Sequence, residues 1–249
     1  MSVSLAREPR RTPLTGSAFI RALAALDDVP AAASPDAFAQ RLAHWFDWTH
    51  AFSLSAALSD AAVRAGVPAF GGRAAASADE REFTRVRAAL LKLVADAPAG
   101  AAPARRLGRA PVSVVAPLEA PVDFATYRQR YAACQLSMET QIAPLRRRLR
   151  ASLADRSSSL ARLAELDTVM EQVVGARERA LLATVAGRLE PRFDHLRGAQ
   201  EDAGAKPDAA WGERFRREMS ELLLAELDLR LQPVEGLLEA CRKSTIDRS

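Results

Sequence analysis

The sequence predicts an all-α protein: an antiparallel three-helix coiled-coil-like bundle with kinked long helices, preceded by a small N-terminal helical head. Three observations lead to this fold class. Apolar residues, many of them leucine, recur every three or four residues through much of the second half of the 249-residue chain. Hydrophobic residues make up 49% of the sequence but aromatic residues only 6%, a composition that favours helix over sheet. Short polar breaks separate the apolar segments, so we expect the helices to fold back on one another.

The N-terminal part predicts an arm followed by the head. Residues 1–13 are polar and basic, with two prolines, and are expected to form a disordered arm. Residues 14–96 are expected to form the helical head, with a glycine-containing loop at 66–77. Helices are expected to begin at capping residues, namely Thr15, Ser34, Thr49, and Ser77 or Asp79.

Residues 97–121 predict an extended linker rich in proline and alanine. No periodic apolar pattern survives there, and the prolines favour polyproline character. The five prolines are Pro98, Pro103, Pro111, Pro117 and Pro121.

Residues 122–245 predict the bundle. Asp123 is a candidate N-cap for the first helix, and Ser157 or Ser158 for the second. The second helix is expected to run for about 60 Å if unbroken, at about 1.5 Å per residue, and Gly204 and Pro207 mark the turn to the third. The expected apolar stripe of the first helix is Phe124, Tyr127, Tyr131, Cys134, Met138, Ile142, Leu145, Leu149 and Leu153. That of the second is Leu160, Leu163, Met170, Val174, Leu181, Val185, Leu189, Phe193 and Leu196. That of the third is Trp211, Phe215, Met219, Leu222, Leu223, Leu227, Leu231, Val234, Leu238 and Cys241.

Each bundle helix contains one interior proline: Pro144, Pro191 and Pro233. Proline removes a backbone hydrogen bond and clashes with the carbonyl four residues back, at a cost of about 3 kcal/mol unless the helix kinks. We therefore predict bends at these positions. They either shape a concave surface or hinge, or simply let a long bundle curve, and the second interpretation is favoured.

Four arginines near the end of the first bundle helix form the sharpest charge run: Arg146, Arg147, Arg148 and Arg150. The favoured interpretation is that they complement the helix dipole and face an acidic neighbouring helix. The alternative is a patch for nucleic acid or anionic lipid. The net charge of +4 is carried almost wholly by arginine, which together with the alanine content indicates a bacterial, high-GC coding bias.

Much of the aromatic mass lies between Trp45 and Phe52. Trp45, Trp48 and Phe52 are candidates for a docking patch, because tryptophan is enriched at binding hot spots. The favoured interpretation is that these residues form the core of the small head.

No pattern predicts catalysis, a metal site or a cofactor site. His44 and His50 are six residues apart and lack ligands at suitable spacing, and Gly71-Gly72 lacks the lysine of a phosphate loop. Cys134 and Cys241 fall on apolar stripes, so buried free thiols are expected. No apolar run is long enough to span a membrane, and we expect a cytoplasmic protein.

Three stretches resemble a family of proteobacterial proteins defined by a domain of unknown function. They are residues 11–16 (RTPLTG), residues 48–58 with Trp48-Thr49 and the segment SLSAAL, and residues 227–237 (LDLRLQPVEGL). The resemblance covers nearly the whole chain apart from the linker. Relatives are encoded beside OmpA-like peptidoglycan-binding proteins and large coiled-coil membrane proteins, which implies a cytosolic partner of an envelope complex. The family resemblance assigns no functional residues to this chain.

These patterns together favour a non-enzymatic helical adaptor or scaffold that binds another helical protein, with self-association into a homo-oligomer left open. Nucleic-acid binding through the arginine run is the alternative function. Whether the head packs on the bundle is not decided by the sequence.

Overall fold

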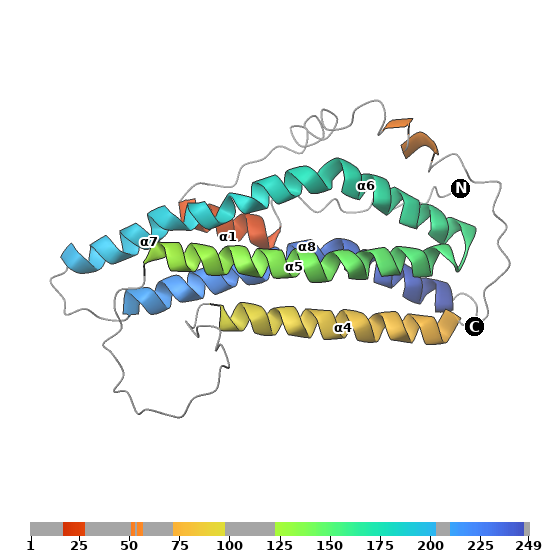
Figure 1. Ribbon diagram of the computed structural model, residues 1–249, viewed down its shortest axis with the longest axis horizontal. Helices are drawn as coiled ribbons and strands as arrows, with labels where there is room; N and C mark the ends of the chain where they lie inside the picture. The colour runs from red at the N-terminus through yellow and green to blue at the C-terminus, as the bar shows by residue number, and fades with distance from the viewer. Residues whose placement is uncertain are drawn as a thin grey trace, which may run out of the picture.

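The computed structural model describes residues 17–27, 51–52, 54–56, 72–97, 123–202 and 210–246. Within these ranges the regular secondary structure is entirely helical, which confirms the predicted all-α class. The long elements lie side by side in an elongated bundle (Figure 1). The helices are α1 (Ala18–Asp27), α4 (Gly72–Asp96), α5 (Phe124–Ala154), α6 (Ser158–Ala183), α7 (Val185–Asp202) and α8 (Ala210–Ile246).

Helices α5 and α8 form the centre of the bundle and run in the same direction. Tyr131 pairs with Glu226, and just beyond the end of α5 Arg156 donates a hydrogen bond to the carbonyl of Cys241 in α8, so residue numbers increase together. All nine residues of the predicted α5 stripe are buried, as is the α8 stripe except for the half-buried Trp211. The sequence therefore identified the two surfaces that make most of the core.

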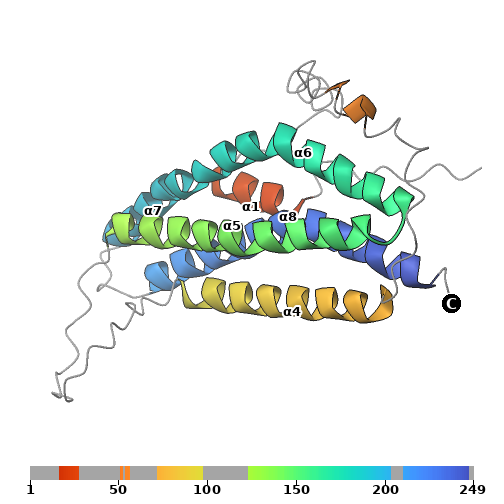
Figure 2. The same ribbon diagram turned by 45° about the vertical axis from the view of Figure 1, so that its right-hand side comes forward.

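Helices α6 and α7 return along the other side of α5. Ser157 is the N-cap of α6, and its hydroxyl accepts a hydrogen bond from the Leu160 amide at 3.3 Å. The predicted single second helix is wrong, because the chain is interrupted at Thr184, whose amide donates to the Leu181 carbonyl at 3.1 Å. Figures 1 and 2 show α6 arching away from α5 before the chain reaches this interruption.

The predicted apolar stripe of α6 is also partly wrong. Leu163 and Leu181 are exposed, while Ala164, Gly175 and Leu182 are buried instead. Part of the α5 interface is instead formed by ion pairs, in which Asp167 and Glu171 of α6 meet Arg146 and Arg150. In α7 the stripe is as predicted, and its buried residues are Val185, Leu189, Phe193 and Leu196.

Helix α4 packs against α5 and α8, and α1 packs against α8 and α7. The ion pairs Glu80–Arg242 and Arg87–Asp228 show that α4 runs antiparallel to α8. Val86, Leu90 and Val94 of α4 belong to the same buried core as the bundle helices. The structure therefore decides the question that the sequence left open: these two helices of the predicted head pack directly on the bundle.

Helix α4 begins at Gly72, so the end of the predicted loop at 66–77 is helical. Its buried Asp79 is tied to α5 by the Ser152 hydroxyl, which donates a hydrogen bond at 2.7 Å. This long-range contact supports the first turns of the helix and could not be seen in local sequence.

The proline-containing helices continue through Pro144, Pro191 and Pro233 without interruption. Bends at these positions stay a prediction, as does the coiled-coil geometry of the bundle. The arm at 1–13, residues 98–121 of the linker, Trp45 and Trp48 lie outside the described residues.

Candidate functional site

The arginine run at the end of α5 divides between two neighbouring helices. Arg146 and Arg150 point toward α6, where both reach Asp167: one Arg146 guanidinium nitrogen lies 2.6 Å from Oδ1, and Arg150 Nε lies 2.6 Å from Oδ2. Arg150 also lies 2.7 Å from Glu171, and Arg146 lies 3.6 Å from it. Two arginines and two carboxylates thus form one network between α5 and α6.

The α5–α6 charge network is largely withdrawn from solvent. The side chains of Arg146 and Arg150 are 15% and 11% exposed, and that of Asp167 is 13% exposed. Burial alone would lower the pKa of Arg146, but the hydrogen bond to Asp167 and the nearby carboxylates raise it above its ordinary value. Charges held in this way are tightly paired, because removing either partner would leave the other desolvated.

Arg148 turns to the opposite side and faces α4. Its Nε lies 3.3 Å from the buried carboxylate of Asp79, which Arg156 also approaches at 3.7 Å. Arg147 is exposed and makes no ion pair with the described residues. Three of the four arginines therefore face acidic side chains of neighbouring helices, which is the arrangement favoured from the sequence.

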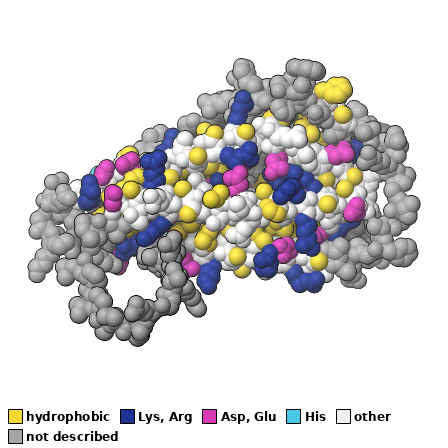
Figure 3. Space-filling view, viewed as in Figure 1, with side chains coloured by type: hydrophobic (Ala, Val, Ile, Leu, Met, Phe, Trp, Pro, Cys, Tyr) yellow, Lys and Arg dark blue, Asp and Glu magenta, His cyan; other side chains and the backbone are white. Residues whose placement is uncertain are grey.

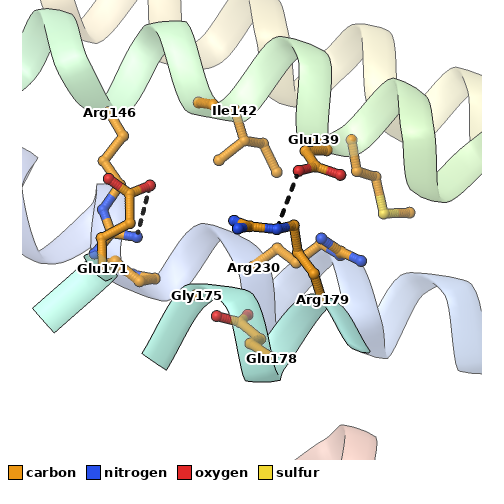
Figure 4. A pocket seen from close by; sticks show the side chains of 11 residues that line it. Glu139, Ile142, Arg146, Glu171, Gly175, Glu178, Arg179 and Arg230 are labelled. Atoms are coloured by element: carbon orange, nitrogen blue, oxygen red, sulfur yellow. Dashed lines mark ion pairs between the residues drawn. The ribbon is translucent and has the colours of Figure 1, made fainter. Parts of the chain in front are cut away.

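A small cavity of about 90 Å³ adjoins the charge network between α5, α6 and α8. Figure 4 shows Glu139 paired with Arg179 on one side of it and Arg146 paired with Glu171 on the other. Gly175 of α6 also lines the cavity. This volume is below the range of about 300 to 1,000 Å³ typical of ligand pockets.

A buried polar cluster lies at the centre of the bundle, close to the end of α6. Glu226 of α8 is fully buried and accepts hydrogen bonds from the Tyr131 hydroxyl at 2.7 Å and from Gln135 at 3.0 Å. Arg230 neutralises its charge at 2.7 Å. Gln135 also donates to the Leu182 carbonyl at 2.8 Å, so the cluster connects α5 and α8 to the end of α6.

Sequence reasoning missed this cluster. A signal was present, because Glu226 stands between Leu223 and Leu227 of an otherwise apolar stripe, and Arg230 follows four residues later. A carboxylate on the buried face of a helix must be paired, and a partner at i+4 is within reach.

The polar cluster alters the neighbouring titrating groups. Burial, with the Glu226 charge as the second cause, raises the pKa of the Cys134 thiol to about 11. The same two causes raise the pKa of Tyr131 far above its ordinary value. Cys134 and Cys241 are both buried and are not joined in a disulfide, as predicted. The raised pKa values keep the Cys134 thiol and the Tyr131 hydroxyl protonated, which is their less nucleophilic form.

An aromatic cluster joins α5, α7 and α8 at the other end of the bundle. The Phe193 ring lies 5.6 Å from that of Phe124 and 5.1 Å from that of Phe215, centroid to centroid. Trp211 packs edge-on against Phe193 at 5.2 Å. These contacts bury most of the cluster, and it is therefore part of the core.

Large apolar side chains on the outside are further candidates for binding. Phe52, which the sequence singled out, is 71% exposed, so for this residue the favoured interpretation as part of the head core is wrong. Leu136 of α5 and Leu181 of α6 are 63% and 60% exposed, and sequence periodicity did not distinguish them from buried leucines. On the face seen in Figure 3, basic and acidic side chains are interspersed, with no extended patch of one sign.

Among the residues that the structure describes, no three His, Cys, Asp or Glu side chains gather closely enough to hold a metal ion. His44 and His50 lie outside these ranges. No described helix is both long and apolar enough to cross a bilayer.

Comparison with known proteins identifies the family of the chain. No curated protein and no solved structure matches it. A family model matches residues 5–243, which is nearly the whole chain and includes every described helix except the last residues of α8. The chain therefore belongs to the family described as "Protein of unknown function (DUF3348)".

Proposed function

We propose that this protein is a non-catalytic helical adaptor or scaffold that binds another helical protein. The observation that carries the proposal is the exposure of Phe52, Leu136 and Leu181, three large apolar side chains that are each at least 60% accessible. Exposed apolar side chains on helices can pack against the apolar face of a partner helix. The elongated bundle offers a long lateral surface for such a contact (Figure 2).

The setting we propose is the cytoplasm of a proteobacterium, where the partner belongs to a cell-envelope complex that contains coiled-coil proteins. This part rests on the resemblance of residues 11–16, 48–58 and 227–237 to family members encoded near OmpA-like and coiled-coil membrane proteins. Self-association into a homo-oligomer is a further form of the same proposal, in which the partner helix comes from a second copy.

Site-specific photocrosslinking in the native cell tests the adaptor proposal. A photoreactive amino acid is placed at position 136 or 181, and at Gln129 as a control, because Gln129 is an exposed polar residue of α5. We expect positions 136 and 181 to crosslink to a helical protein, identified by mass spectrometry, and Gln129 to give much less product. Equal labelling at the three positions, or no crosslink at 136 and 181, would refute the proposal.

Nucleic-acid binding through the arginine run is the alternative, and the geometry favours it less. Arg146 and Arg150 are paired with Asp167 and are mostly buried, so they cannot contact phosphates without breaking these pairs. Arg147 and Arg148 are the exposed members of the run. If these two arginines bind nucleic acid, the affinity for nucleic acid must fall steeply as the salt concentration rises, and the substitution Arg147→Gln must also lower that affinity. Absence of a gel shift at low salt would exclude this function.

A further inference from the structure

Helix α6 is buried on two opposite faces. One face meets α5, where Glu171 lies 2.7 Å from Arg150. Val169 and Val173 are also buried, with 7% and 5% of their surface exposed. At about 100° per residue, each valine lies about 160° around the helix from Glu171 and therefore faces away from α5. Together with the half-buried Leu166, these valines form a second apolar face, which we call the outer face of α6.

The common core of the described helices does not account for the burial of the outer face. That core includes Ala164 and Leu182 of α6 but neither Val169 nor Val173. Of the described helices, α5 makes the most extensive contact with α6, and it lies against the opposite face. A side chain becomes inaccessible only when other atoms cover it. The cover of the outer face therefore comes from parts of the same chain outside the described ranges.

Residues 28–50 connect two described parts of the chain that lie on different sides of α6. The first is α1, which packs on α8 and α7, and the second is the pair of short segments at 51–52 and 54–56. In Figures 1 and 2, α1 lies on the bundle side of α6, and the short segments lie on the side turned away from α5. The connection between them must therefore cross from the bundle side to the outer side of α6.

The same connection carries apolar side chains suited to the outer face. Its Phe38, Leu42 and Trp45 are spaced by four and three residues, which is the spacing of one helical face. A helix over residues 36–46 has a length of about 17 Å, which is enough to cover the distance of about 11 Å from Leu166 to Val173, at about 1.5 Å per residue. The length and the apolar pattern of this segment therefore both fit the outer face.

The other stretches outside the described ranges are poorer in large apolar rings. Residues 28–50 contain four of the five aromatic residues that lie outside those ranges, namely Phe38, Trp45, Phe46 and Trp48. The fifth is Phe70, in residues 57–71. Residues 1–16, 98–122 and 203–209 contain none. Because aromatic rings supply the largest apolar area per side chain, residues 28–50 are the best candidate for the cover.

We propose that the outer face of α6 is the docking surface for residues 36–46 of the same chain, which pack their apolar side on Leu166, Val169 and Val173. This assigns Trp45 to an internal contact. The docked segment ends shortly before Phe52, whose 71% exposed side chain is left for a partner. The inference goes beyond the proposed adaptor function, because it concerns a contact within one chain and holds whether or not a partner is found.

Thiol labelling of the full chain tests the burial of the outer face in solution. Val173→Cys places a thiol in this face, and mass spectrometry reads its labelling separately from that of the buried Cys134 and Cys241. The matched control is Leu181→Cys, because Leu181 is 60% exposed on the same helix. We expect the thiol at position 173 to react at least about tenfold more slowly than the thiol at position 181, since labelling requires access.

Substitutions in the docked segment test what covers the outer face. The triple change Phe38→Ser/Leu42→Ser/Trp45→Ser should raise the labelling rate at position 173 at least about tenfold and leave the rate at position 181 unchanged. Phe52→Ser is the control within the same part of the chain, and it should leave both rates unchanged because Phe52 is exposed. An unchanged rate at position 173 in the triple variant would overturn the inference.

Intramolecular crosslinking provides a second measurement that leaves residues 36–46 unaltered. A photoreactive amino acid at position 169 of the full chain should crosslink to residues 36–46 of the same molecule, as mapped by mass spectrometry. A mixture of isotope-labelled and unlabelled chains separates these products from crosslinks between two copies. Products in another stretch, products between copies only, or no product would each contradict the inference. Failure here is distinguishable from a failed photocrosslink at positions 136 and 181, which would refute the adaptor function itself.

Discussion

At the residue scale, individual carboxylates connect helices that are distant in sequence. Glu218 of α8 accepts two hydrogen bonds from Arg192 of α7, both at 2.7 Å, and one from Arg214 at 3.1 Å. The hydrogen bond from Arg192 is the main cause that lowers the pKa of Glu218 below its ordinary value of 4.5. Its side chain is 21% exposed, so the pair is only partly screened by water.

We predict that Glu218→Gln removes an acid-sensitive contribution to stability. Because the folded state lowers the pKa of Glu218, the stabilisation is fully present above pH 4.5, its ordinary value, and is lost as the pH falls through the lower folded pKa. The original chain should therefore exceed the variant by about 1 kcal/mol near neutral pH, and the difference should vanish in acid. Urea unfolding at a series of pH values measures it. A difference that does not change with pH would contradict the prediction.

At the element scale, the contact between α5 and α8 combines an apolar stripe with one buried charge. Glu226 is fully buried, whereas the Asp228 side chain on the same helix is 61% exposed and lies 4.0 Å from Arg87. The two acids therefore allow a direct comparison of a buried pair with a surface pair.

We predict that Glu226→Ala destabilises the protein by about 3 to 5 kcal/mol, because it leaves Arg230, Tyr131 and Gln135 without their common acceptor in the core. The control Asp228→Ala should cost less than about 0.5 kcal/mol, since exposed pairs contribute little. Chemical unfolding followed by circular dichroism compares the two. Similar losses for both variants would mean that Glu226 is not as isolated from water as its burial indicates.

Helix α7 allows a test of the proline-bend hypothesis. Pro191 is exposed and cannot donate a hydrogen bond to the Gly187 carbonyl. We predict that Pro191→Ala stabilises the protein, by at most about 3 kcal/mol, because it restores this bond. Gly187→Ala is a useful comparison, since no atom beyond its own helix backbone lies within 4 Å of the added Cβ, and it should stabilise by about 1 kcal/mol. Thermal unfolding measures both; a loss of stability in Pro191→Ala would show that the packing of α7 requires a bend there.

At the scale of the whole molecule, the described helices share one core. Leu90 of α4 is fully buried against the bundle helices, and Arg242 of α8 reaches back to Glu80 of α4. Since α4 precedes the linker and α8 ends the bundle, the contact joins segments from the two sides of the linker. We therefore expect these helices to unfold together.

We predict that Leu90→Ala lowers the free energy of unfolding by about 2 to 5 kcal/mol and shifts a single cooperative transition. The surface substitution Lys92→Ala on the same helix is the control, because Lys92 is exposed. Far-UV circular dichroism and tryptophan fluorescence should report the same midpoint. Two transitions, of which only one is shifted by Leu90→Ala, would instead indicate a head that folds as a separate domain.

The sequence by itself determined the helical class and the inward faces of α5, α7 and α8. These helices bury leucine and aromatic side chains, and apolar periodicity reports such faces directly. It also limited the start of α6 to Ser157 or Ser158, of which the structure has Ser157 as N-cap, because a capping hydroxyl acts on the amides of its own first turn.

Only the tertiary structure decided how α6 and α4 are attached and where the polar groups meet. The Asp167 network and the Glu226 cluster join residues from different helices, so no local pattern contains them. Leu181 is exposed whereas the adjacent Leu182 is buried, and which of the two faces the core depends on how α6 is oriented against its neighbours. Packing of α4 on α8 depends on contacts between residues more than a hundred positions apart, such as Glu80 and Arg242, and these form only when the whole chain has folded.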